Sequence, residues 1–393
     1  MIRFLGSKQQ GLESLRALLT AHHPVEVVTL DDRADGRSCL ADIRALAQDH
    51  ACPVVVVPDT GELPPSVYRP ADLLVVIGWY RLLPAPILEM ARLGAVGVHN
   101  SLLPRYRGGA PLVWALLEGE PTVGASLFSL GPGIDDGPVW SRIMVDVMPD
   151  DDIGSVLERL IPASARMVQD TVPRILAGTI APEPQRHEEA TYGAQRTIDD
   201  GVVNWQWSAR DIQRFVRAQT KPYPGAFTYL GRQRLRLWQA TVLAETVHAT
   251  PGQVTGRTAS SVHVACGGGQ VLALHAVSLD GGDVVPDADD VLGQRAADGA
   301  TSGNADPGRE IWMDEDLERR RRAGRVRRDR RGLPQREPEG LHAGARPPYA
   351  DDDAIGGPHH PGGETRLELI DCRAKNRRPP LERSGGGHRC LGG

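Results

Sequence analysis

Short apolar runs that alternate with amphipathic segments restrict the fold more than any other feature of this sequence. Residues 54–57 are four consecutive valines, and residues 73–77 are Leu-Leu-Val-Val-Ile. Apolar runs of this length are typical of strands that are covered on both faces, as in parallel sheets. Similar runs at 2–5, 25–30 and 95–99 predict three more strands of the same sheet.

Segments with helical spacing lie between these runs. Residues 12–19 carry leucines along one helical face, and residues 40–50 and 84–93 predict two further helices. The alternation predicts a doubly wound, mostly parallel α/β sheet. Ligands bind such sheets beyond the carboxyl ends of the strands, so residues 78–81 and 99–101 should lie at one crevice.

The rest of the chain changes character twice. A strand at 139–147 and a helix at 153–176 complete a catalytic domain that we place at 1–188. Short alternating runs between glycine-rich turns then predict a small, OB-like β-barrel domain at 189–295. Residues 296–393 are rich in Gly, Pro and Arg and poor in large apolar side chains, so we expect a disordered tail there.

Arginine is concentrated in this tail at 319–331. Basic runs can bind nucleic acid, but they are equally usual in solvated tails. The composition also fits an extension produced by read-through or a shift of reading frame. These three alternatives stay open.

Composition excludes several broad classes of protein. The chain is 40% hydrophobic and 24% charged with a formal net charge of -5, which gives no whole-chain argument for nucleic-acid binding. No apolar run approaches the roughly 18 residues of a spanning helix, so we expect no membrane partner. The five cysteines are scattered without a CxxC pair, which predicts a cytoplasmic protein with neither a disulfide framework nor a metal site.

The stretch that points most strongly to chemistry runs from Gly97 to Pro111. It reads Gly-Val-His-Asn-Ser-Leu-Leu-Pro-Arg-Tyr-Arg-Gly-Gly-Ala-Pro, and a later loop at 134–137 reads Ile-Asp-Asp-Gly. Together they resemble the core signature of the formyltransferase family that uses 10-formyltetrahydrofolate, which includes methionyl-tRNA and amino-sugar formyltransferases. The resemblance implies the formyltransferase fold and a one-carbon transferase.

Formyl transfer to an amine needs a proton acceptor and an oxyanion donor. The amine attacks the formyl carbon and loses a proton while negative charge develops on the formyl oxygen. A histidine can take the proton, and a carboxylate beside it fixes the tautomer. His99 at a strand end and Asp135 in the later loop match the histidine and the aspartate of the family's signature.

The oxyanion donor departs from the family's pattern. The family carries an asparagine two residues before the histidine, where this chain has Gly97. Asn100 would point away from His99 in an extended strand, so it can substitute only if the strand has ended or bulged. Loss of such a donor typically costs about 100- to 1,000-fold in rate. We expect Asn100, a backbone N–H or water to take the role, or else a weak or altered catalyst.

The resemblance also indicates the residues that hold the folate. The loop after His99 lies against the folate in the family, and the segment at 79–84 matches one that lines the pterin pocket. Apolar walls suit a flat heterocycle, although each leucine would also fit an ordinary core. The residues assigned to the cofactor are Trp79, Leu82, Leu83, Ser101, Leu102, Leu103, Pro104 and Asp136.

The resemblance extends over residues 1–294. Residues 221–227, Lys-Pro-Tyr-Pro-Gly-Ala-Phe, are closer to the amino-sugar branch of the family. The implied acceptor is the primary amine of an amino-sugar nucleotide, an amino acid or methionyl-tRNA, so nucleic acid is a partner only if the acceptor is charged tRNA. The alternatives are a 10-formyltetrahydrofolate hydrolase and, because of Gly97, a catalytically weakened folate-binding relative.

Overall fold

The computed structural model describes residues 1–60, 63–280 and 282. The tail expected at 296–393 lies outside the described residues, as do the last residues of the domain expected at 189–295. Both domain limits therefore stay predictions.

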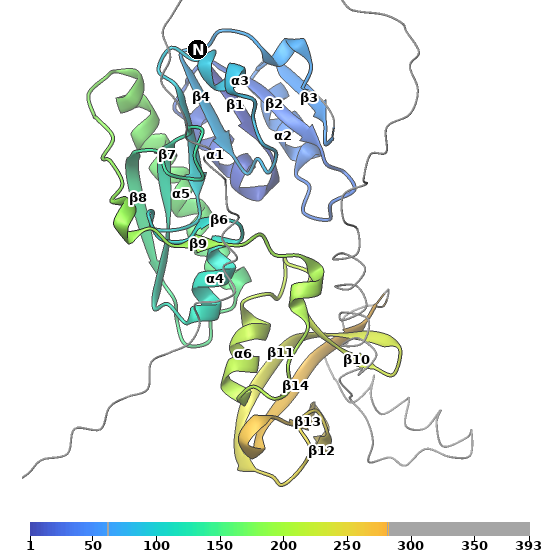
Figure 1. Ribbon diagram of the computed structural model, residues 1–393. Helices are drawn as coiled ribbons and strands as arrows, with labels where there is room; N and C mark the ends of the chain where they lie inside the picture. The colour runs from blue at the N-terminus through green and yellow to red at the C-terminus, as the bar shows by residue number, and fades with distance from the viewer. Residues whose placement is uncertain (61–62, 281, 283–393) are drawn as a thin grey trace, which may run out of the picture. The chain divides into compact units, whose positions relative to one another are not determined.

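The first part of the chain forms a seven-stranded mixed sheet with the order β3-β2-β1-β4-β5-β7-β8 (Figure 1). Neighbouring strands from β3 to β5 are parallel, and β7 and β8 extend the sheet in antiparallel fashion. The expected mixed, mostly parallel sheet is confirmed. The strands are β1 (Ile2–Gly6), β2 (Val25–Asp31), β3 (Val54–Pro58), β4 (Leu73–Ile77), β5 (Ala95–His99), β7 (Thr122–Ser129) and β8 (Val139–Asp146).

Helices cover both faces of this sheet because alternate strand residues are apolar on each side. One core joins Phe4 and Val27 to the buried sides of helices α1, α2 and α5, whereas a second core joins Leu5 and Val28 to Ile87 of α3. The doubly wound arrangement follows from these two cores. The helices are α1 (Lys8–Thr20), α2 (Leu40–Asp49), α3 (Ala85–Glu89), α4 (Pro111–Glu118) and α5 (Ile153–Leu176).

Two elements differ from the expectation. The helix expected at 84–93 ends at Glu89, because Ala91 leaves it to form a parallel bridge with Ala71. Strand β7 has no clear signal in the sequence, since Gly124 and Ser126 interrupt its apolar pattern, yet it is buried between β5 and β8.

A second sheet follows, with five antiparallel strands in the order β10-β11-β14-β13-β12. Residues between 203 and 277 form the core of this sheet, which includes Trp205 and, from helix α6 (Ala209–Arg217), Phe215. Closure of this sheet into a barrel stays a prediction. Its strands are β10 (Ala226–Leu230), β11 (Gln233–Thr246), β12 (Val254–Thr258), β13 (Ser261–Ala265) and β14 (Gln270–Leu279).

A connecting segment between the two sheets is tied to the loop after β5. Strands β6 (Arg107–Gly108) and β9 (Tyr192–Gly193) form a short parallel pair.

Among the described helices, none has the length and apolar character needed to cross a bilayer. Single-turn 3-10 helices lie at η1 (Pro65–Val67), η2 (His187–Glu189), η3 (Ile198–Gly201) and η4 (Gly267–Gly269).

Candidate active site

A cavity of about 890 Å³ opens at the carboxyl end of β4, beside Ala95 at the start of β5, and extends along the α3 side of the sheet to the loop of Asp135. Its walls are mostly apolar and include Trp79, Leu83 and Leu130, while Asp135 is a charged residue at its edge. Cavities of this size and lining are typical of sites for drug-sized ligands. Of the two strand ends expected at one crevice, residues 79–81 line this cavity, whereas residues 99–101 do not.

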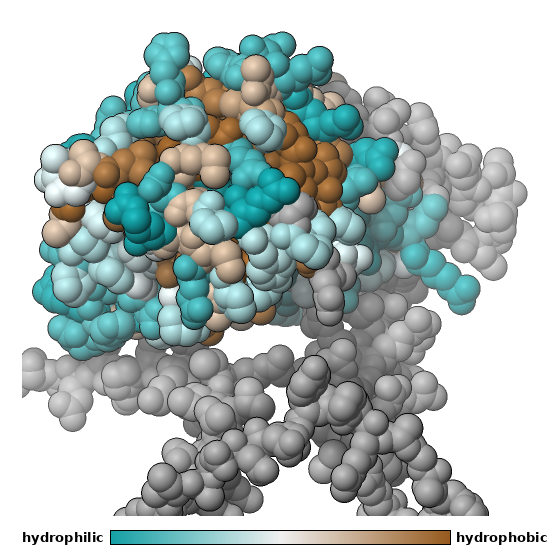
Figure 2. Space-filling view, turned by 90° about the horizontal axis from the view of Figure 1, so that it is seen from above, coloured by the Kyte–Doolittle hydropathy of each residue, from teal (hydrophilic) through white to brown (hydrophobic). Residues whose placement is uncertain are grey.

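A second cavity, of about 860 Å³, lies at the amino edge of the same sheet, between Met1, Pro24 and Pro53. The face seen from above carries hydrophobic side chains among hydrophilic ones (Figure 2). No residue assigned from the sequence to catalysis or to the cofactor lines this cavity. The cavity near Asp135 is therefore the candidate active site.

His99 is the last residue of β5, and its side chain is only 11% exposed. Its Nε2 atom lies 2.7 Å from the backbone carbonyl oxygen of Tyr106, which can only accept a hydrogen bond. The proton of a neutral His99 must therefore be on Nε2. This leaves the lone pair on Nδ1, and Nδ1 lies 3.6 Å from Oδ2 of Asp135.

Asp135 occupies the loop between β7 and β8 with a φ angle of 48°, a left-handed conformation that aspartate tolerates better than most residues. Its Oδ2 atom accepts a hydrogen bond of 2.7 Å from the backbone N–H of Gly108. The 3.6 Å separation from His99 is too long for a hydrogen bond but short for two charges. The carboxylate is therefore placed to stabilise an imidazolium formed at Nδ1.

Asn100, the third predicted catalytic residue, points to a different partner. Its amide pairs reciprocally with Gln10 of α1, with contacts of 2.8 Å and 3.1 Å, and Gln10 also lies 3.3 Å from Ser164 of α5. The structure thus joins His99 to Asp135 but joins Asn100 to the helices on the opposite face of the sheet.

Gly97 faces the cavity side of β5. A Cβ atom at this position would lie 3.0 Å from Cδ2 of Leu130 and 3.2 Å from the carbonyl oxygen of Val76. Leu130 lines the cavity, so it occupies the space toward which a side chain at position 97 would extend. The family's asparagine would require Leu130 to move by a few tenths of an ångström.

The residues assigned to the cofactor fall into two groups. Trp79, Leu82 and Leu83 line the cavity, and Leu82 is 98% exposed at its rim. The indole Nε1 of Trp79 is buried and has no hydrogen-bond partner among the described residues. The second group, Ser101, Leu102, Leu103, Pro104 and Asp136, does not line this cavity.

The loop from Ser101 to Pro104 is instead held by internal contacts. The Ser101 hydroxyl donates to the carbonyl of Arg105 at 2.7 Å, and the Ser126 hydroxyl donates to the carbonyl of Ser101 at 2.8 Å. Leu103 is buried against Phe128, which also meets His99 edge-on. These contacts fix the loop next to His99, and its role toward a cofactor stays a prediction.

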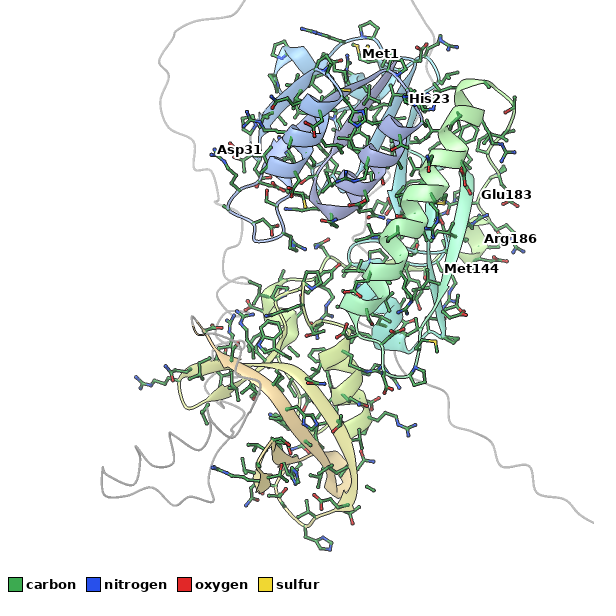
Figure 3. All side chains as sticks on the ribbon, turned by 180° about the vertical axis from the view of Figure 1, so that it is seen from behind. Met1, His23, Asp31, Met144, Glu183 and Arg186 are labelled. Carbon is green, nitrogen blue, oxygen red and sulfur yellow. The ribbon has the colours of Figure 1, made fainter. Side chains whose placement is uncertain are left out.

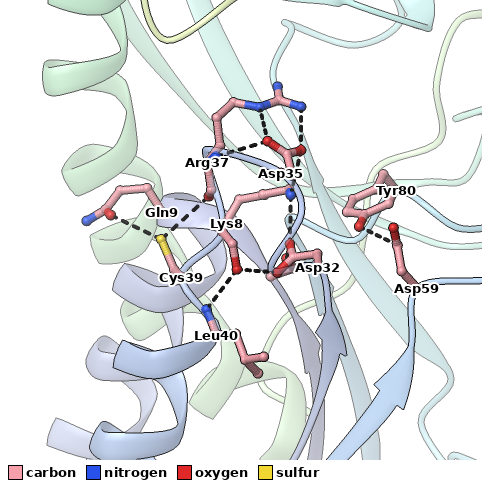
Figure 4. A network of polar contacts seen from close by, with 11 residues as sticks. Lys8, Gln9, Asp32, Asp35, Arg37, Cys39, Leu40, Asp59 and Tyr80 are labelled. Carbon is pink, nitrogen blue, oxygen red and sulfur yellow. Dashed lines mark hydrogen bonds and ion pairs between the residues drawn. The ribbon is translucent and has the colours of Figure 1, made fainter.

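Charged side chains at the ends of β1 and β2 form a network beside the cavity (Figure 4). Lys8 Nζ lies 2.7 Å from Asp32 and 2.8 Å from Asp35, and Arg37 also pairs with Asp35. The hydrogen bonds from Arg37 and Lys8 hold the pKa of Asp35 well below its usual range, although partial burial opposes this. Burial and a hydrogen bond to an aspartate raise the pKa of Tyr80, which keeps this cavity residue a neutral donor.

Two features of the site have no signal in the sequence. The Gly108 N–H that holds Asp135 is a backbone group, and Gln185, which also contacts the Asp135 loop, lies in the connecting segment after α5. Both depend on contacts between residues that are far apart in the chain, which periodicity does not report.

Comparisons with known proteins identify the family to which this chain is similar. A family model described as "Formyl transferase" matches residues 67–172, and one described as "Formyl transferase, C-terminal domain" matches residues 197–294. The methionyl-tRNA formyltransferase of Geobacter sulfurreducens is 32% identical over 311 residues, which cover 77% of this chain and 97% of that enzyme. The methionyl-tRNA formyltransferase of Sorangium cellulosum is 34% identical over 315 residues, which cover 76% of this chain and 98% of that enzyme.

A solved structure is similar in fold. The N-formyltransferase from Helicobacter canadensis, in complex with folinic acid and dTDP-3-aminofucose, matches with a TM-score of 0.54 and 15% identity. The match covers 70% of this chain and 98% of that one. At this identity the likeness bears on the fold alone, whereas the two sequence relatives are matched over nearly their whole length.

Proposed function

This chain belongs to the formyl transferase family, and from that premise we propose that His99 and Asp135 move the proton when an amine takes up the formyl group. The enzyme is a one-carbon transferase that transfers a formyl group from a formyl-folate to an amine. The observation that carries the assignment of the pair is the approach of His99 Nδ1 to the Asp135 carboxylate at the edge of the large cavity.

The cavity suits 10-formyltetrahydrofolate, which we assign as the donor. Apolar walls from Trp79 and Leu83 match a flat heterocycle, and the volume of about 890 Å³ is large enough for a drug-sized molecule. The unpartnered indole N–H of Trp79 is a donor that a polar ligand edge would satisfy. The folate supplies the formyl group, and the residues of this chain supply binding and proton transfer.

Proton transfer follows from the tautomer of His99. The carbonyl of Tyr106 keeps one proton on Nε2, so Nδ1 is the basic atom. As the amine nitrogen bonds to the formyl carbon, its proton passes to Nδ1. The imidazolium so formed lies between the Asp135 carboxylate and the Tyr106 carbonyl, which both stabilise it. It gives the proton to the folate nitrogen when the bond from the formyl carbon to that nitrogen breaks, so that tetrahydrofolate leaves as a neutral amine and His99 is neutral again.

Stabilisation of the oxyanion is the weakest part of this site. Gly97 contributes no side chain, and the Asn100 amide is already paired with Gln10. We therefore expect a backbone N–H or water to meet the formyl oxygen, with a slower reaction than an asparagine at position 97 would give.

The acceptor is the primary amine of an amino-sugar nucleotide, an amino acid or methionyl-tRNA. Similarity in sequence favours methionyl-tRNA, because the relatives matched over most of their length carry that name. The Lys-Pro-Tyr-Pro-Gly-Ala-Phe segment at 221–227 favours an amino sugar. An assay with 10-formyltetrahydrofolate across these three acceptors tests the proposal, and formate release without an acceptor would identify a hydrolase instead.

A further inference from the structure

Gln185 joins the Asp135 loop to a buried arginine, and we propose that Arg107 and Gln185 are positioning residues that hold the Asp135 carboxylate against His99. Neither residue lines the cavity, so neither is expected to touch substrate. The inference rests on the proposed function, because that function gives the Asp135 carboxylate its role.

The amide of Gln185 uses its full hydrogen-bonding capacity. Its Nε2 atom donates to the carbonyl of Asp135 at 2.8 Å and to the carbonyl of Gly137 at 2.6 Å. Its Oε1 atom accepts from Nε of Arg107 at 3.1 Å and from Nη2 at 2.8 Å. The carbonyls only accept and the guanidinium only donates, so the amide has one possible orientation. Gln185 is buried, at 5% exposure.

These contacts restrain a backbone that would not hold its shape alone. Asp135 has a left-handed φ of 48°, a conformation that persists in a non-glycine residue only when its surroundings enforce it. Gln185 holds the carbonyl of Asp135 and that of Gly137 two residues later. The Gly108 N–H holds the carboxylate itself, so the loop is fixed at three points.

Arg107 in turn holds Gln185 from a fully buried position, at 1% exposure. Besides Gln185, it donates to the hydroxyl of Tyr192 at 3.0 Å and lies 3.3 Å from Nδ1 of His187. In the part of the chain that the structure describes, no carboxylate pairs with Arg107. A buried guanidinium without an anion needs such hydrogen bonds to offset the loss of hydration. A lysine cannot reproduce the paired donors of the planar guanidinium.

The connecting segment that carries these partners is itself fixed to both loops. The Arg107 N–H donates to the carbonyl of Thr191 at 2.8 Å, and Glu183 exchanges backbone hydrogen bonds with Val139 of β8. Glu183 and Arg186 lie beside β8 near Met144 (Figure 3). The segment therefore links the loop of Asp135 to the loop after His99.

The decisive variant is Gln185→Glu. Its carboxylate keeps the acceptors for Arg107 but has no N–H for the carbonyls of Asp135 and Gly137. We expect kcat for formyl transfer to fall by about 10- to 100-fold, because small misplacements of a catalytic group have effects of this size. The KM for 10-formyltetrahydrofolate should stay within about twofold, since the cavity is untouched. The thermal midpoint should stay close to that of the wild type, because the ion pair with Arg107 offsets part of the cost of leaving the two carbonyls without a donor.

A matched control lies two residues earlier. Glu183 is an exposed side chain whose ion pair with Arg142 does not involve the Asp135 loop, so Glu183→Gln should leave kcat unchanged. If Gln185→Glu does not fold, Arg107→Lys provides the same test, because it keeps the charge and loses the bidentate contact. A folded variant at either position with kcat within twofold of the wild type would overturn the proposal.

A double-mutant cycle separates this inference from the proposed function. In the background of Asp135→Asn, the Gln185→Glu change should have almost no further effect on kcat, since both act through one carboxylate. Additive losses would overturn the positioning role. An Asp135→Asn variant with normal kcat would instead refute the proposed catalytic pair, whatever Gln185 does.

Discussion

His99 presents its unprotonated Nδ1 atom to Asp135, with Nδ1 and Oδ2 at 3.6 Å, because the carbonyl of Tyr106 keeps the imidazole proton on Nε2. The two residues come from different elements, the end of β5 and the loop between β7 and β8. Asp135 lines the large cavity, and His99, which does not line it, lies within 3.6 Å of the Asp135 carboxylate.

Removal of the Asp135 charge should stop most of the proton transfer. Asp135→Asn keeps an oxygen that can accept from Gly108 but does not stabilise the imidazolium. We expect kcat to fall by about 100-fold or more, within the usual range for general acid–base catalysis. Steady-state kinetics measure this, with the exposed Asp49→Asn as the control. A folded Asp135→Asn enzyme whose kcat is close to that of the wild type would contradict the catalytic role.

The apolar wall of the cavity should determine folate affinity. Trp79→Ala removes the indole that lines the cavity, together with its unpartnered N–H. Truncation of a tryptophan that anchors a binding site typically costs about 2 kcal/mol or more, so the Kd for a 5-formyltetrahydrofolate probe should rise by roughly 30-fold. Calorimetry measures the Kd. Trp207, which is 38% exposed and does not line the cavity, supplies the control Trp207→Ala. If Trp79→Ala binds the probe as tightly as the wild type does, the folate binds elsewhere.

An asparagine at position 97 should restore the missing oxyanion donor if space is made for it. Gly97→Asn alone meets Leu130 at 3.0 Å, and overpacking of this kind typically costs about 1–3 kcal/mol of stability. The pair Gly97→Asn with Leu130→Ala should fold better than Gly97→Asn alone and raise kcat above the wild type. The matched control is Leu130→Ala. If the paired variant and this control have the same kcat, another group already stabilises the oxyanion.

The network beside the cavity predicts a dependence of stability on pH. The pKa of Asp35 is lowered in the folded state by the hydrogen bonds from Arg37 and Lys8, against a usual value of 3.8. This contribution is fully present above the usual value and is lost as the pH falls through the lowered folded-state value. Urea unfolding should therefore show Asp35→Asn to be less stable than the wild type at pH 7, with a smaller difference at pH 3. A difference independent of pH would contradict this.

Much of the first sheet can be predicted from the sequence, because its parallel strands are continuous apolar runs such as Val54–Pro58 and Leu73–Ile77. Strand β7 is missed because Gly124 and Ser126 interrupt its pattern, and its burial comes from neighbours on both sides. Helix α3 ends early because a tertiary bridge between Ala71 and Ala91 outweighs local propensity. Tertiary pairing decides both cases.

In the candidate site too, some features can be predicted from local sequence and others depend on tertiary contacts. His99 and Asp135 are predictable because each is set in a recognisable local motif, although their mutual approach requires the fold. The pairing of Asn100 with Gln10 and the hold of Gln185 on the Asp135 loop connect residues far apart in the chain. Neither residue type nor spacing reports such contacts, so a sequence reading leaves Asn100 available for catalysis where the structure shows it already paired.

The role of His99 in formyl transfer can be measured by single turnover with 10-formyltetrahydrofolate on the wild type and His99→Ala, with and without each amine acceptor. We expect a formylated amine and tetrahydrofolate only when an acceptor is present, with a rate at least about 100-fold lower in His99→Ala. Formate release at the same rate without an acceptor, or an unchanged rate in His99→Ala, would contradict this expectation.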